Sequence, residues 1–79
     1  MFLSQATYKR IEQLCIEKQF RSINSLCNAA GVAQSTVYNL TDGSTHNPSS
    51  LLILRLCRTL NITLSEFYSS ELFLELEDD

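Results

Sequence analysis

The sequence predicts an all-α domain of five helices with a short acidic C-terminal tail. Apolar residues recur at three- and four-residue spacing through most of the chain, which is the period of a helix with one buried face. Residues that begin or end helices separate these segments, among them Gly31, the Asp42-Gly43 pair and Pro48. No β-strand is needed before residue 70.

The first helix is expected from about Gln5 to Lys18, where the spacing gives one apolar inner face. That face is formed by Tyr8, Ile11, Leu14, Cys15 and Lys18. A second helix is expected over about Ile23 to Ala30, with Ser22 as its N-cap because a hydroxyl can accept the first free backbone N–H groups. Gly31 then ends it, since glycine takes a positive φ without a Cβ penalty.

The third helix is expected over about Gln34 to Thr41, with Val37 and Leu40 on its inward face. Its other face is short, uncharged and rich in hydrogen-bonding groups. It carries Gln34, Ser35, Tyr38 and Asn39. Amides of this kind can pair bidentately with adenine in a major groove, and hydroxyls can contact several bases. The third helix is therefore a candidate reader of bases.

The last two helices have recognisable starts. Asn47 as cap and Pro48 at the first helical position are expected to open the fourth helix, which ends near Leu60. Thr63 and Glu66 have the spacing of a capping box, which opens a short fifth helix. The apolar faces of these two helices are formed by Ile53, Leu56, Cys57 and Leu60, and by Leu64 and Phe67.

The segment from Ser69 to Asp79 leaves its structure open. Its leucines alternate with other residues, as in a half-buried strand, yet Leu72, Phe73 and Leu76 also share one side of an extended fifth helix. The large apolar residues near the end of the chain suggest that this tail either covers Phe67 and Tyr68 or meets a second subunit. A disordered acidic tail is the alternative.

Composition limits the function classes. The chain has 79 residues, of which 44% are hydrophobic and 19% charged, as expected of one small globular domain. No apolar run approaches a membrane span and no secretory leader is visible, so a cytoplasmic protein is expected. Three cysteines within apolar helical patterns favour reduced core thiols, and a single histidine argues against a zinc site. No catalytic cluster, phosphate loop or cofactor motif is present, so neither an enzyme nor a small-molecule substrate is expected.

The order of these residues resembles the phage Cro and repressor group of helix-turn-helix proteins, often called XRE-type. With Ile23 as the first motif position, the small residue falls at Cys27 and the turn glycine at Gly31. The apolar motif positions fall at Leu26, Val32, Val37 and Leu40. The resemblance continues through Asp42-Gly43, Asn47-Pro48 and the segment 62–67, and covers about residues 5 to 68.

This resemblance implies a five-helix repressor-like DNA-binding domain at residues 1–68, with residues 69–79 as a tail and possible dimer contact. It places Gln34, Ser35, Thr36 and Asn39 at or near double-stranded DNA, and leaves Tyr38 either at the DNA or packed over the first helix. The loop that often carries basic residues in the family here reads Ser44, Thr45, His46 and Asn47, so phosphate contacts would rely on these groups and on the start of the fourth helix.

Two departures from the family change the expected contacts. The first motif position is usually a glutamine that braces a phosphate, but here it is Ile23, so this contact is not expected. Ala33 stands where a serine or threonine usually caps the reading helix. The start of the third helix is therefore expected to lack a side-chain cap.

The charge opposes binding to phosphate unless it is unevenly distributed. The formal net charge is −3, whereas DNA affinity normally grows with lysine and arginine. Residues 1–65 hold all six basic groups and only three acids, and residues 66–79 hold the other six acids. The body of the domain can therefore approach a duplex if the acidic end points away from it.

The resulting expectation is a homodimeric transcriptional regulator, most simply a repressor that acts by occupying an operator with the helix at 33–41. The alternative is a protein-interaction module on the same fold, an antitoxin-like or antirepressor partner without strong DNA binding. A large exposed apolar patch near Leu51, Leu52 and Leu54 would favour that alternative.

Overall fold

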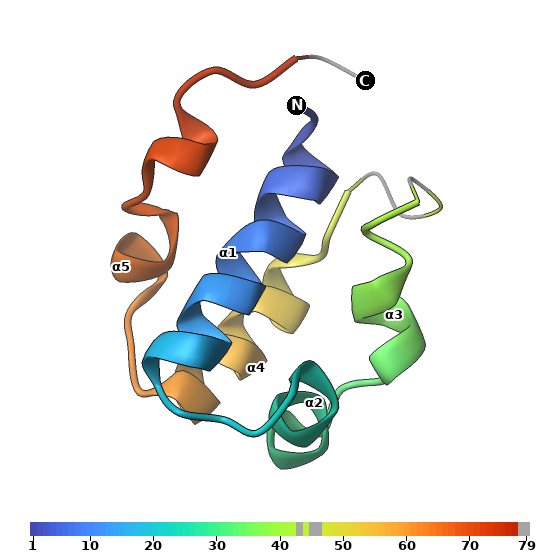
Figure 1. Ribbon diagram of the computed structural model, residues 1–79, viewed down its shortest axis with the longest axis vertical. Helices are drawn as coiled ribbons and strands as arrows, with labels where there is room; N and C mark the ends of the chain where they lie inside the picture. The colour runs from blue at the N-terminus through green and yellow to red at the C-terminus, as the bar shows by residue number, and fades with distance from the viewer. Residues whose placement is uncertain (43, 45–46, 78–79) are drawn as a thin grey trace.

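The chain folds into helices only, within the part that the structure describes. The computed structural model describes residues 1–42, 44 and 47–77. Its elements are α1 (Leu3–Glu17), α2 (Ile23–Ala30), α3 (Gln34–Tyr38), α4 (Ser50–Leu60), α5 (Leu64–Tyr68) and the 3₁₀ turn η1 (Glu71–Phe73). Figure 1 shows α1 lying in front of α4, with α3 on one side and α5 on the other. The predicted five-helix, all-α architecture is confirmed.

One apolar core joins the helices. Its fully buried members come from all five helices and from the turn after α3; they include Ile11, Leu26, Val37, Leu40, Ile53, Leu56 and Phe67. The three cysteines also lie in this core as free thiols, as predicted, and burial raises the pKa of each thiol. Raised thiol pKa values leave little reactive thiolate at neutral pH. The cysteines therefore serve packing.

Three of the predicted helix ends are confirmed. The Ser22 hydroxyl accepts the Ser25 backbone N–H at 3.1 Å and so caps α2. Gly31 ends that helix with a φ of 70°, in the left-handed region. Thr63 and Glu66 form the capping box of α5, which lowers the pKa of the Glu66 carboxyl because backbone and hydroxyl donors stabilise its charged form.

The start of α4 differs from the prediction. Asn47 is not the cap and Pro48 is not the first helical residue, because the backbone at Ser49 is still extended and α4 begins at Ser50. The Ser49 hydroxyl accepts the Leu52 backbone N–H at 3.0 Å and caps the helix. The side-chain cap is therefore supplied by the later serine, two residues beyond the predicted cap.

Helix α3 is shorter than the predicted 34–41, because it ends at Tyr38. The following residues form a tight turn in which the backbone N–H of Leu40 donates to Val37 and that of Thr41 donates to Tyr38. The Thr41 hydroxyl also donates to the Tyr38 carbonyl at 2.7 Å. These bonds satisfy the end of the helix while Leu40 remains fully buried. Helix α1 also differs slightly from prediction, spanning Leu3–Glu17 rather than 5–18.

The tail is neither a strand nor an extension of α5 in its described part. The Ser70 hydroxyl accepts the Leu72 backbone N–H and starts the short turn η1. This turn brings the Phe73 ring to 5.1 Å from the Tyr68 ring and 6.2 Å from the Phe67 ring, measured between centroids. The tail thus covers Phe67 and Tyr68, which was one of the two predicted roles for its apolar residues.

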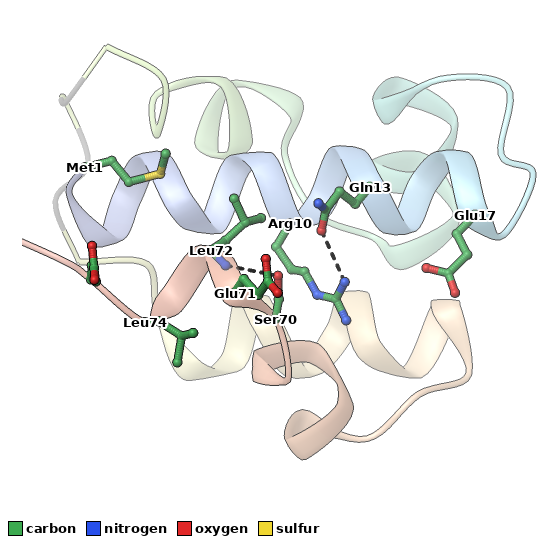
Figure 2. A pocket seen from close by; sticks show the side chains of 9 residues that line it. Met1, Arg10, Gln13, Glu17, Ser70, Glu71, Leu72 and Leu74 are labelled. Carbon is green, nitrogen blue, oxygen red and sulfur yellow. Dashed lines mark hydrogen bonds between the residues drawn. The ribbon is translucent and has the colours of Figure 1, made fainter.

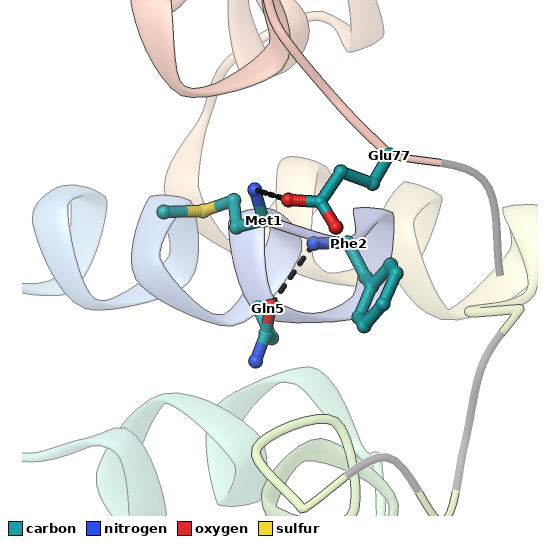
Figure 3. A network of polar contacts seen from close by, with 4 residues as sticks. All are labelled: Met1, Phe2, Gln5 and Glu77. Atoms are coloured by element: carbon teal, nitrogen blue, oxygen red, sulfur yellow. Dashed lines mark hydrogen bonds and ion pairs between the residues drawn. The ribbon is translucent and has the colours of Figure 1, made fainter.

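The end of the described tail lies against the start of the chain. The Glu77 backbone N–H donates to the Met1 carbonyl at 3.0 Å, in an isolated bridge between Phe2 and Glu77. The Glu77 carboxylate also lies 3.4 Å from the Met1 amino group (Figure 3). Both groups are solvent-exposed to a large degree, so this ion pair contributes little to stability.

Arg10 attaches α5 to α1, a role that the sequence analysis missed. Its Nε donates to the Phe67 carbonyl at 2.7 Å and its Nη2 to the Glu66 carbonyl at 2.8 Å. Its Nη1 donates to the Gln13 side chain at 3.2 Å, as Figure 2 shows. The guanidinium therefore donates to two carbonyls at the end of α5, of which that of Glu66 also accepts the Ser69 backbone N–H.

Candidate nucleic-acid interface

Helices α2 and α3 form a helical hairpin around the turn at Gly31. The Val32 backbone N–H donates to the Cys27 carbonyl at 3.0 Å, which closes the turn. Val37 is fully buried, so the opposite face of α3 points to solvent. Ser35, Thr36 and Asn39 are exposed there. With Tyr38, which is also exposed, and the partly buried Gln34, all five predicted base-reading residues lie on this short helix or its C-cap.

Gln34 is held by a residue that the sequence analysis did not single out. Its Nε2 donates to the Asn28 Oδ1 at 3.4 Å across the turn between α2 and α3. Asn28 and Gln34 are six residues apart, on either side of the tight turn at Gly31, and this spacing is the one signal of their contact in the sequence. Whether the two side chains meet depends on the angle between α2 and α3.

Tyr38 packs on α1 without being covered by it. Its ring centroid lies 6.1 Å from that of Tyr8, and the Tyr38 residue keeps 42% of its surface exposed. The pKa of Tyr8 is raised, mainly by burial and then by the Glu12 carboxylate. Of the two predicted positions for Tyr38, packing over the first helix is therefore observed, and its exposed part remains free for a further contact.

Both departures at the motif have the expected structural result. Ile23 is buried in the core, where it cannot reach a phosphate. Ala33 is the N-cap of α3 and supplies no side-chain hydrogen bond. The start of α3 is thus held by the burial of Val37 and by the tight turn at Gly31, without a side-chain cap.

The predicted phosphate loop is described only in part. Ser44 and Asn47 are exposed, whereas Thr45 and His46 lie outside the described residues. The Ser44 backbone N–H donates to the Asp42 carboxylate at 2.9 Å, which lowers the pKa of that carboxyl. This contact orders the first residues of the loop directly after α3.

Comparison with known protein families decides the identity of this hairpin. A family model for the Cro/C1-type helix-turn-helix DNA-binding domain matches residues 10–71. The chain belongs to the Cro/C1-type helix-turn-helix family. No curated protein and no solved structure matches the chain.

The Cro/C1-type domain carries an arginine beside its third helix. Arg55 of α4 lines a groove of about 200 Å³ together with Thr36 and the Ser49 cap. Arg55 is exposed, and so is Arg21, which lies just before the cap of α2. Arg55 therefore places a positive charge beside α3.

The acidic tail lies against another face of α1 than α3 does. Glu71 and Glu75 line a cavity of about 820 Å³ with Arg10, Gln13 and Glu17 of α1 (Figure 2). The α1 residues that neighbour the end of α3 are instead Gln5, Tyr8, Lys9 and Glu12, which line a pocket with Thr41. At 100° per residue these two sets point in different directions from the helix axis. The carboxylates of Glu71 and Glu75 are therefore kept away from α3.

The features that would favour other functions are weak within the described residues. Leu51 is 53% exposed, but Leu52 is buried and Leu54 is half-buried, so no large apolar patch forms there. No cluster of potential metal ligands is found in the part of the chain that the structure describes. None of the described helices is long and apolar enough to cross a membrane.

Proposed function

We propose that this Cro/C1-type domain is a sequence-specific, double-stranded-DNA-binding transcriptional regulator that represses by occupying an operator. The observation that carries the proposal is the face of α3, where amide and hydroxyl groups are exposed opposite the buried Val37. Such groups match the donors and acceptors that bases display in the major groove.

In this proposal the two parts of the interface have different roles. The base-reading residues are Gln34, Ser35, Thr36, Tyr38 and Asn39, and the phosphate-binding residues are Ser44, Thr45, His46 and Asn47. Contacts to phosphate fix the register of the helix on DNA, whereas contacts to base edges give the sequence preference. Neutral loop donors release no counterions, so affinity for random DNA is expected to be low.

Selection of bound sequences from a random DNA pool tests the proposal. We expect enrichment of one short motif, and a log–log salt slope of about −2 per monomer if Arg21 and Arg55 supply the main cationic contacts. Repeated rounds without an enriched motif, at salt low enough for measurable binding, would contradict sequence-specific recognition. An enriched motif with a slope near zero would instead remove the arginines from the interface.

We further propose a homodimer in which the tail surface meets a second copy. The tail surface consists of Ile16, Leu72 and Leu74, of which Ile16 is 78% and Leu74 is 76% exposed. Leu72 links the two because it lines one cavity with Leu74 and a neighbouring one with Ile16. Helix-turn-helix dimers bind two half-sites about one helical turn apart, so a dimer would raise the affinity of a weakly binding monomer.

Leu74→Asp tests this dimer without removing Phe73 from the core, as truncation after Tyr68 would do. The buried charge should disrupt the interface, so sedimentation equilibrium should show a dimer for the original chain and a monomer for the variant. Tight binding to paired half-sites should be lost with it. Leu51→Asp is the matched control, because Leu51 is also an exposed leucine but lies on α4. If Leu51→Asp dissociates the dimer and Leu74→Asp does not, the interface lies on α4.

A further inference from the structure

A side chain outside the recognition helix contacts the first base-reading residue. Asn28 is exposed in the last turn of α2, and its Oδ1 accepts a hydrogen bond from the Gln34 Nε2 at 3.4 Å. The backbone of Asn28 is fixed, because its carbonyl accepts the Gly31 N–H that caps α2. Asn28 is thus a fixed acceptor at the entrance to α3.

The chemistry of the two amides makes this contact directional. A glutamine amide has two N–H donors and one carbonyl acceptor. Asn28 takes one donor and leaves the second N–H and the Oε1 of Gln34 unused. If the Gln34 amide alone were rotated by half a turn, its oxygen would face the Asn28 oxygen, which is repulsive, so the two amides keep complementary orientations. The contact therefore restricts where the Gln34 side chain lies.

The groups that this contact leaves free match what adenine requires. Bidentate recognition of adenine uses one N–H donated to N7 and one carbonyl that accepts from the N6 amino group. The groups left free on Gln34 are one donor and one acceptor on the same planar amide. A side chain already held in one orientation also loses less rotamer freedom when it binds.

We propose that Asn28 is a positioning residue that presents the Gln34 amide to adenine and so sets base preference at one position of the site. This inference rests on the proposed function, because Gln34 must read a base for its orientation to matter. It assigns a specificity role to α2, whose exposed residues carry no base-reading role in the proposed function.

The test measures base preference at the position that Gln34 reads. Affinities are determined for the selected site and for the three single-base variants at that position, with the original chain and with Gln34→Ala, Asn28→Ala and the double variant. Gln34→Ala should lose about 5- to 140-fold of discrimination. Asn28→Ala should lose part of it, about 3- to 10-fold as an order-of-magnitude estimate for one orienting hydrogen bond. The double variant should be no worse than Gln34→Ala alone, because the two residues act through one contact.

Two further variants separate positioning from a structural role. Asn28→Asp keeps an acceptor oxygen in place, so it should retain the base preference even if its negative charge weakens binding to every DNA. Asn24→Ala removes another exposed asparagine one turn earlier in α2 and should leave the preference unchanged. Equal preference in Asn28→Ala and the original chain would overturn the inference, and so would a loss in Asn28→Asp as large as that in Asn28→Ala.

Failure of the inference differs from failure of the proposed function. If Gln34→Ala relaxes the preference and Asn28→Ala does not, Gln34 reads a base without help and only the positioning role is wrong. If neither variant changes the preference of a protein that binds a selected site, the assignment of Gln34 as a reader is also wrong.

NMR relaxation of the Gln34 side-chain amide in the free protein gives an independent readout, because Asn28→Ala should make that group more mobile. Unchanged mobility would contradict the contact itself.

Discussion

Replacing Gln34 and Asn39 together by alanine should remove most of the preference for the selected site and leave binding to random DNA nearly unchanged. Each good base contact contributes ~1–3 kcal/mol of discrimination. For two residues the loss is therefore about 2–6 kcal/mol, or roughly 25-fold to 10⁴-fold in the ratio of specific to non-specific affinity.

The structure allows this change without loss of the fold. Asn39 is exposed and Gln34 is only partly buried, and Asn39 has helical backbone angles that alanine adopts readily. Binding to the selected site and to a shuffled sequence is measured at the same salt concentration, with thermal unfolding as the check on the fold. Equal losses on both DNAs would mean that these residues contribute only general affinity, and α3 would no longer be the reader.

Arg10→Met should destabilise the domain by about 2–3 kcal/mol, because the variant keeps the aliphatic stem but leaves two carbonyls of α5 without their charged donor. A loss of this size corresponds to a fall of roughly 10–20 °C in the unfolding temperature of a domain of this length. Thermal and urea unfolding followed by circular dichroism measure the change.

Neighbouring and conservative variants make the test of Arg10 specific. Lys9→Met removes an exposed cation from the adjacent position and should change the stability by less than about 0.5 kcal/mol. Arg10→Lys should recover only part of the loss, since an ammonium group lacks the planar fork that reaches both carbonyls. If Lys9→Met is as damaging as Arg10→Met, the general charge of α1 matters and the contact with α5 does not. Below the unfolding temperature, base preference should persist in Arg10→Met because Arg10 does not face α3.

The sequence by itself determined the features that depend on neighbouring residues. The cap at Ser22, the turn at Gly31 and the capping box of Thr63 with Glu66 each need only a few residues of chain, and all three formed as predicted. The helical period placed Val37 in the core for the same reason. The family followed from the order of these local signals, and the family match confirmed it.

Local chemistry was insufficient where two signals competed or where a helix ended against the core. Asn47-Pro48 and Ser49 could each begin α4, and the helix begins after Ser49, whose hydroxyl accepts the Leu52 backbone N–H. At the end of α3 the chain forms a tight turn in place of another helical turn, and Leu40 is buried from that turn. The sequence left the structure of the tail undecided because its apolar pattern fits both the period of a strand and that of a helix. The tail instead forms the 3₁₀ turn η1, in which Phe73 packs against Phe67 and Tyr68.

Only the tertiary structure decided which distant groups meet. Arg10 bonds to carbonyls 56 and 57 residues away, and no local pattern in the sequence specifies such partners. The contact of Asn28 with Gln34 depends on the angle between α2 and α3, and that of Tyr8 with Tyr38 on the distance between α1 and α3. Side-chain hydrogen bonds form within a few tenths of an ångström, whereas helical periodicity fixes only which face is buried. The packed core sets these distances, so the sequence identified the reading helix while the fold determined how its side chains are held.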